Sequence, residues 1–200
     1  GWHVPQPLDD DGMDRVTDAF VHAARRAVRL GFEVVELHSA HGYLLHQFLS
    51  PLSNQRDDAY GGTLADRLRF PLQVLEAVRA VVPSSVALGM RISATDWVDG
   101  GWDVDDSIEY VGAAQSVGID YVCVSSAGLT AQARVPIGPG YQVPAAARIR
   151  AATGVVTRAV GLITSAMQAN AIITEGQADQ VALARAILDD PRWGWHAADA

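Results

Sequence analysis

The sequence predicts an α/β protein of the (β/α)8 TIM-barrel type, in which this chain forms about five βα units of a partial barrel. Five short apolar runs alternate with helical patterns, which indicates a parallel sheet because parallel strands need crossover helices and are buried on both faces. Polar and small residues gather just after each apolar run, where barrel enzymes assemble their active sites. A doubly wound open sheet is the alternative, but no GxGxxG sequence follows the first strand.

The first part of the chain predicts three pairs of a helix and a strand. Helical periodicity covers 12–30, 63–82 and 103–117, and apolar strand-like runs cover 32–38, 86–92 and 119–125. Gly31 and Gly118 are predicted helix stops, and Thr63 is a predicted N-cap. Pro71 lies inside the second helical pattern, which implies a kink or a late start.

The second part of the chain continues the alternation after a Gly- and Pro-rich loop that starts at residue 126. The predicted elements are a helix over 144–152, a strand over 155–161, a helix over 165–175, a strand over 178–184 and a short helix over 185–189. No linker divides the chain, so residues 1–200 are predicted to form a single domain. Five strands cannot close an eight-stranded barrel, so either the chain is the carboxyl-terminal part of a barrel or three strands are supplied by something else.

The composition argues against several classes of function. The chain is 49% hydrophobic and 19% charged, which is enough for one substantial core. A formal net charge of −8 offers no basic face for nucleic acid or for an anionic membrane surface. All 15 basic residues are Arg, which excludes Schiff-base aldolase and P-loop chemistry because each needs a lysine amine.

The expected cellular location is the cytoplasm. The single cysteine, Cys123, cannot form an internal disulfide, which fits a reducing compartment. No segment reaches the roughly 18 unbroken apolar residues of a membrane span, and the first residues show no signal-peptide pattern.

The candidate catalytic residues follow the first predicted strand. His38 ends this strand and His41 lies three positions later, so the two rings converge only if the chain turns at Ser39-Ala40. Neutral imidazoles could donate hydrogen bonds to a carbonyl oxygen or an anion, and the Tyr43 phenol could deliver a proton. Alternatively, these are core residues that bond to backbone carbonyls. No metal site is predicted, because no further cluster of His or carboxylates supplies a third ligand.

Candidate binding residues end other predicted strands. A buried Arg91 needs an anionic partner, which is either a carboxylate of the barrel or a bound cofactor or substrate. Gly161 and the pair Ala184-Arg185 stand at consecutive strand-to-helix junctions, where barrels commonly bind phosphate. The alternative for these two junctions is an ordinary tight turn.

Several motifs together resemble the Old Yellow Enzyme family of FMN-dependent ene-reductases, especially its branch of bacterial NADPH dehydrogenases. The motifs are VELHSAHGYLLHQFLSPLSNQRDDAYGGTLADRLRF, RISATDWVDGGW, VSSAG, PIGPGYQVP, AVGLIT and ARAILDDPRW. They keep the family's order and cover nearly the whole chain. The resemblance implies that the chain corresponds to about the last five βα units of the family's barrel.

The resemblance also implies roles for the candidate catalytic residues. His38 and His41 match the pair that hydrogen-bonds the substrate carbonyl, or a phenolate that mimics it, above the flavin. Tyr43 matches the tyrosine regarded as the proton donor to the substrate α-carbon. Arg91 matches the arginine beside the flavin pyrimidine, where it stabilises the anionic reduced ring.

Gly161, Ala184 and Arg185 match residues around the FMN phosphate. The family usually has Gly where Ala184 stands, and this departure bears on FMN affinity because a methyl group could crowd the phosphate or prevent a positive φ. The residues that the family places on its first three strands to contact the flavin ring are not in this sequence.

The resemblance implies an FMN-dependent oxidoreductase that uses NADPH or NADH to reduce the C=C bond of a small α,β-unsaturated carbonyl compound. It also implies a homo-oligomer. One alternative is a non-catalytic, truncated barrel fragment that lacks the full FMN site or pairs with a partner that supplies strands. Another is a phosphate-handling lyase or isomerase that uses Gly161 and Arg185 without flavin.

Overall fold

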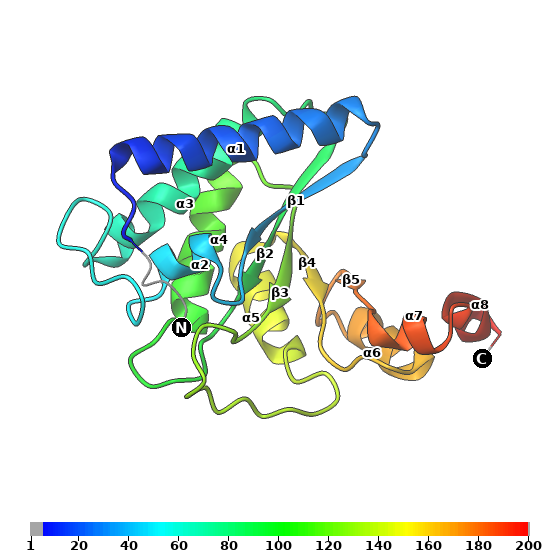
Figure 1. Ribbon diagram of the computed structural model, residues 1–200. Coiled ribbons are helices and arrows are strands. Elements are labelled where there is room, and N and C mark those ends of the chain that lie inside the picture. The colour runs from blue at the N-terminus through cyan, green and yellow to red at the C-terminus, as the bar shows by residue number, and fades with distance from the viewer. Residues whose placement is uncertain (1–5, 200) are drawn as a thin grey trace.

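The computed structural model describes residues 6–199, which form a single parallel sheet with helices packed against it (Figure 1). The five strands lie in the order β1-β2-β3-β4-β5, which is also their order in the chain. Their bounds are Val34–Ser39 for β1, Ala87–Ser93 for β2, Tyr121–Ser125 for β3, Val156–Ala159 for β4 and Gln180–Val181 for β5.

The helix bounds are Asp10–Arg29 for α1, Leu44–Leu49 for α2, Leu64–Arg79 for α3, Val104–Val117 for α4, Val143–Thr153 for α5, Ala166–Thr174 for α6, Arg185–Asp189 for α7 and Trp193–Ala198 for α8. Helices α2 to α6 lie between consecutive strands, whereas α1 precedes β1 and α7 and α8 follow β5. Helices α1, α3, α4 and α5 pack side by side in that order. Neighbouring helices on one side of a sequentially ordered parallel sheet are typical of a barrel, whereas a doubly wound sheet reverses its strand order. The predicted partial (β/α)8 barrel is therefore confirmed, and the doubly wound alternative is wrong.

Local signals in the sequence set several helix ends. The Thr63 side chain accepts a hydrogen bond from the Asp66 N–H at the start of α3, as predicted for an N-cap. Gly118 ends α4 with φ 103°, a left-handed conformation that glycine adopts without strain. Helix α3 starts directly after its cap and continues through Pro71, so the predicted late start is wrong.

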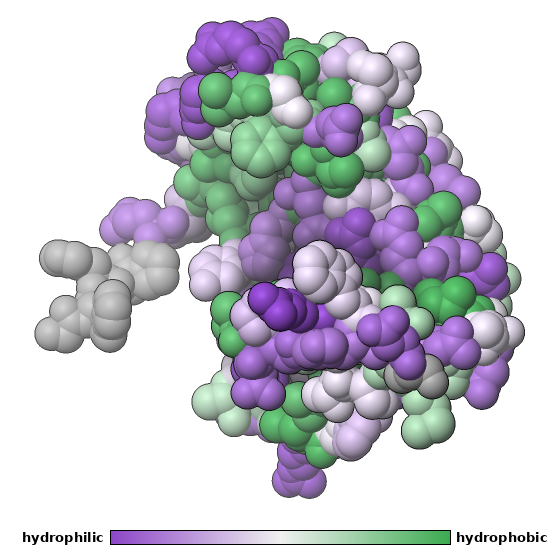
Figure 2. Space-filling model, turned by 90° about the vertical axis from the view of Figure 1, so that its right-hand side faces the viewer, coloured by the Kyte–Doolittle hydropathy of each residue, from purple (hydrophilic) through white to green (hydrophobic). Residues whose placement is uncertain are grey.

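The two faces of the sheet carry different residues. Leu88, Met90 and Val122 are almost fully buried beneath the helices. The opposite face, here called the inner face, carries polar side chains whose strand positions are in register: His38 with Arg91, Arg91 with Cys123, and Cys123 with Arg158. Figure 2, which views the molecule from the β5 side, shows hydrophilic surface gathered in a hollow. Function should therefore be sought on the inner face and at the carboxyl edge above it.

Candidate active site

The predicted catalytic side chains meet at the carboxyl end of β1. The ring centroids of His38 and His41 are 5.1 Å apart, and those of His38 and Tyr43 are 5.2 Å apart. Arg91 of β2 is the register partner of His38 on the neighbouring strand. Two imidazoles, a phenol and a guanidinium thus lie at one edge of the sheet, as the convergence of parallel strand ends predicts.

A tight turn after β1 brings the two histidines together. His41 and Gly42 both have left-handed backbones, with φ 58° and 74°, and the Tyr43 N–H donates to the Ala40 carbonyl at 3.1 Å. A Cβ atom on Gly42 would lie 2.4 Å from the Gly128 carbonyl oxygen, so only glycine fits there. The turn on which convergence depended is present, and it is centred just beyond the predicted Ser39-Ala40 position.

Both histidines have lowered pKa values, so both are neutral at pH 7. Burial lowers the pKa of His38, and the positive charge of Arg91 lowers it further. Burial lowers the pKa of His41 to about 4, and Arg91 again adds to the effect. A neutral imidazole has one N–H donor and one acceptor nitrogen, which suits it to bind an oxygen without transferring a proton.

A buried polar network holds the His41 ring and was not predicted from the sequence. His41 Nε2 lies 2.7 Å from Ser125 Oγ at the end of β3. The Ser125 and Ser126 hydroxyls donate to Gln142 Oε1 at 3.2 and 2.7 Å, and Gln142 Nε2 donates to the Val160 carbonyl at 3.0 Å. The ring of His41 is therefore satisfied by a side chain, not by the backbone carbonyl that the core alternative required. The only signal for this network was the polar VSSAG sequence at a strand end.

Two arginines on the inner face differ in their partners. Arg158 forms an ion pair with Glu36 at 3.3 Å, and its guanidinium stacks 4.3 Å from the centre of the Tyr121 ring. Arg91 forms no ion pair within residues 6–199, and its buried Nε has no hydrogen-bond partner there. A carboxylate of the described barrel strands thus does not satisfy Arg91. Arg91 is half-buried, and its buried Nε without a partner favours an external anion as the group it binds.

A cavity of about 220 Å³ brings the four predicted binding residues together. Its lining includes Arg91, Gly161, Ala184 and Arg185, and also Ser125, which contacts His41. Gly161 has φ 114°, and a Cβ atom there would lie 2.6 Å from Gln142 Nε2. Glycine is therefore required at this point of the cavity wall.

Three predicted site residues are exposed to solvent, namely Tyr43, Ala184 and Arg185. The Tyr43 residue is 64% exposed and stands directly before α2, with its ring beside His38. Ala184 precedes α7 with φ −122°. Because this φ is negative, the methyl group of Ala184 is compatible with the backbone, which removes one of the two expected consequences of the missing glycine.

The described residues contain no metal site and no membrane helix. Within residues 6–199, no three His, Cys, Asp or Glu side chains are grouped so that they could hold a metal ion. No helix in that range is both long enough and apolar enough to cross a bilayer.

Comparison with known proteins identifies the family. A model of the NADH:flavin oxidoreductase / NADH oxidase family matches residues 3–199. The chain belongs to this family. The resemblance to the Old Yellow Enzyme family is thereby confirmed, and membership of an oxidoreductase family argues against the lyase or isomerase alternative.

Individual relatives also support membership of the NADH:flavin oxidoreductase family. An NADPH dehydrogenase from Geobacillus thermodenitrificans is 45% identical over 195 residues, which are 98% of this chain and 56% of the relative. An NADPH dehydrogenase from Listeria innocua is 39% identical over 195 residues, with 98% of this chain and 57% of the relative covered. The chain therefore spans little more than half the length of these relatives.

Solved structures agree on the fold. Morphinone reductase in complex with tetrahydroNAD matches with a TM-score of 0.78 and 27% identity, over 97% of this chain and 51% of that one. Histamine dehydrogenase from Rhizobium sp. 4-9 matches with a TM-score of 0.83 and 27% identity, over 97% of this chain and 29% of that one. That the matched part is the last five units of the barrel stays a prediction.

Proposed function

We propose that this chain contributes the carbonyl-binding and phosphate-binding parts of an FMN-dependent oxidoreductase. The proposed reaction is the NADPH- or NADH-dependent reduction of the C=C bond of a small α,β-unsaturated carbonyl compound. The observation that carries the proposal is the cluster of two neutral imidazoles beside Arg91, which has no anionic partner within residues 6–199. Such a cluster suits an oxygen that gains negative charge during a reaction.

The residues present fit the FMN cofactor of the family. The unpartnered Nε of Arg91 offers a donor to an anionic ring, and Gly161 lines the same cavity as Arg91. Arg185 lines the same cavity and offers a positive charge for the phosphate. When bound, FMN would carry hydride from the nicotinamide to the substrate β-carbon.

The chain's own residues would bind and protonate the substrate. If the Ser125 hydroxyl turned from Gln142 Oε1 to donate to His41 Nε2, the imidazole proton would lie on Nδ1, where it can reach a substrate oxygen. His38 would supply the second donor to the same oxygen. Both donors polarise the carbonyl and make its β-carbon electrophilic. Tyr43, with its ring beside His38, would deliver the proton to the α-carbon, the role that the family resemblance assigns to it.

The test is to load the protein with FMN and follow NADPH oxidation with and without cyclohexenone. We expect a yellow protein whose NADPH oxidation accelerates with the enone. His38→Ala and His41→Ala should each weaken binding of the carbonyl and slow enone reduction about 10- to 100-fold. This is the range expected when one or two hydrogen bonds to a developing charge are lost.

His22→Ala is the matched control, because His22 is exposed on α1, outside the proposed site. It should leave the rate unchanged. An FMN-loaded protein that oxidises NADPH but is indifferent to the enone would refute the enone as substrate. Failure to take up FMN at all would refute catalysis by this chain.

The open sheet supports a second candidate, a barrel part without activity of its own. Within residues 6–199, β1 and β5 each pair with only one neighbour, so both edges of the sheet can accept further strands. In this case the protein would need a partner segment before it bound FMN. Thermal melting with and without FMN separates the two candidates, since a ligand that binds the folded state raises the melting temperature by mass action. Size-exclusion chromatography tests the expected homo-oligomer.

A further inference from the structure

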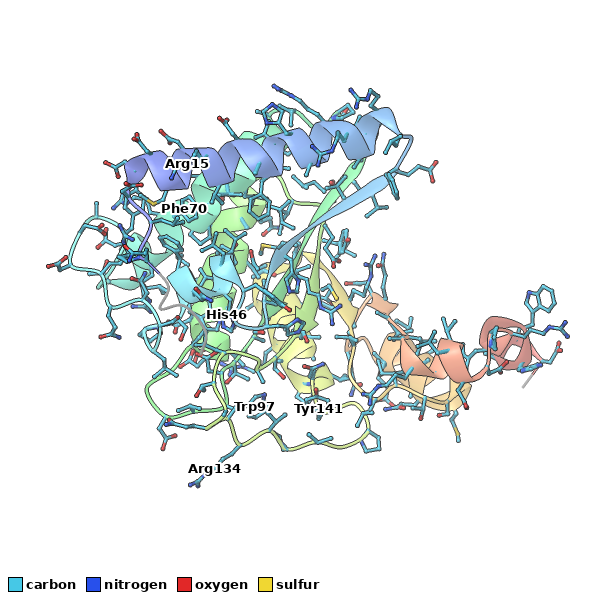
Figure 3. The ribbon with its side chains drawn as sticks, in the orientation of Figure 1. Arg15, His46, Phe70, Trp97, Arg134 and Tyr141 are labelled. Carbon is cyan, nitrogen blue, oxygen red and sulfur yellow. The ribbon has the colours of Figure 1, made fainter. Side chains whose placement is uncertain are left out.

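A buried histidine lies directly behind the turn that carries His41. His46 is in α2, and its side chain is fully buried. Its Nδ1 accepts a hydrogen bond from the Gly42 N–H at 2.9 Å. Figure 3 labels His46 at α2. Since an accepting Nδ1 carries no proton, the ring proton lies on Nε2.

The protonated nitrogen of His46 faces a buried carboxylate. His46 Nε2 lies 3.1 Å from Asp96 Oδ1, with the N–H directed off the line between the atoms. Asp96 is fixed on its other side, where Oδ2 accepts from the Ser50 hydroxyl at 2.6 Å and from the Trp102 N–H at 2.9 Å. Burial raises the pKa of Asp96, but these hydrogen bonds together with His46 outweigh it and hold the pKa below its ordinary value. Asp96 is therefore an anion that keeps the proton on His46 Nε2.

We propose that His46, oriented by Asp96, is a positioning residue that fixes the His41 turn for binding of the substrate oxygen. This inference rests on the proposed function. His46 touches no ligand itself, because it is sealed behind Gly42. It acts through one hydrogen bond to the residue that follows His41, and Asp96 links that bond to the loop after β2.

The turn needs such a bond because its backbone is intrinsically unfavourable. His41 has φ 58°, a left-handed conformation that is unfavourable for a non-glycine residue. Without the Nδ1 acceptor, the Gly42 N–H would lose its partner in a half-buried site, which is also unfavourable. The turn should then relax. The His41 ring should no longer keep the orientation in which Nε2 contacts Ser125 Oγ.

Two partial mimics of histidine separate the roles of its two nitrogens. His46→Asn places an amide oxygen near the position of Nδ1 and can still accept from Gly42. His46→Gln places an amide nitrogen near the position of Nε2 and can keep the contact with Asp96. His46→Leu keeps neither contact. Melting temperatures of the three variants identify any that fail to fold.

The first readout needs no flavin. Hydrogen exchange of the Gly42 amide should accelerate at least 10-fold in His46→Gln and His46→Leu but stay within about 3-fold of the unsubstituted protein in His46→Asn. The ring ¹⁵N shifts of His46 should show a protonated Nε2 and an unprotonated Nδ1. Protection of the Gly42 amide in His46→Gln equal to that in His46→Asn would overturn the proposal.

The second readout is binding of a phenol, 4-hydroxybenzaldehyde, to the FMN-loaded protein. We expect about 10-fold weaker phenol binding in His46→Gln, recovery towards the original affinity in His46→Asn, and FMN affinity that changes less than 2-fold in either. Equal phenol affinity in both variants would overturn the positioning role. If the unsubstituted protein binds no phenol, the proposed function fails, and the Gly42 exchange pattern alone decides whether His46 holds the turn.

Discussion

Replacing Arg91 with Met should separate ligand binding from folding. Most buried arginines stabilise a fold through their bonds, so that their loss lowers stability. Arg91 is half-buried, and its Nε has no partner within residues 6–199. The folded protein without flavin should therefore lose little when Arg91→Met removes the charge and keeps the apolar stem.

The structure gives the expected magnitudes by comparison with Arg67. The Arg67 guanidinium donates to the Leu49 and Gly62 carbonyls, both at 2.7 Å. Hydrogen bonds to charged groups contribute about 1.5–3 kcal/mol each, so Arg67→Met should cost about 3–6 kcal/mol of unfolding free energy. Arg91→Met should change it by less than about 1 kcal/mol in either direction.

The assay is urea unfolding of both variants without flavin, followed by FMN titration of Arg91→Met. Loss of one charge-assisted contact of about 1.5–3 kcal/mol should weaken FMN binding about 10- to 150-fold. A drop in stability for Arg91→Met as large as that for Arg67→Met would show that Arg91 is paired within the protein. Unchanged FMN affinity in Arg91→Met would refute its role in binding.

Two further predictions concern pH and packing. His41 has a lowered pKa of about 4, so the unfolded chain binds its proton more readily, and stability should fall as pH drops from about 6.5 towards 4. In a plot of the urea unfolding midpoint against pH, His41→Gln should reduce the slope between about pH 6.5 and pH 4. An unchanged slope would contradict the assignment of this pH dependence to His41. Gly89→Ala should lower the free energy of unfolding by about 1–3 kcal/mol, because the new Cβ would lie 2.2 Å from the Tyr121 ring, which is held by a hydrogen bond to Glu36. A melting temperature equal to that of the unsubstituted protein would refute this packing argument.

The fold was largely predictable because its signals are local. Thr63 caps α3 and Gly118 ends α4 through backbone preferences that the sequence displays directly. Helix α2 was missed because its six residues are too few to show helical periodicity. Strand β5 was predicted over 178–184 but pairs only over Gln180–Val181, since pairing depends on its neighbour as well as on its own apolar residues.

The site was predictable only in part, because half of it consists of contacts between distant residues. The positions of His38, His41 and Arg91 at strand ends follow from the alternation of strands and helices. The contact between His41 and Ser125 spans 84 residues and has no local signature. Nor does the sequence distinguish Arg158, which is paired with Glu36, from Arg91, which has no such partner within residues 6–199.

The most direct test of the central claim is a crystal structure of the protein soaked with FMN and 4-hydroxybenzaldehyde. The account predicts the phosphate in the cavity lined by Gly161 and Arg185, and the phenol oxygen within hydrogen-bond distance of both the His38 and the His41 ring. Flavin bound elsewhere, or a phenol oxygen that contacts neither ring, would contradict it.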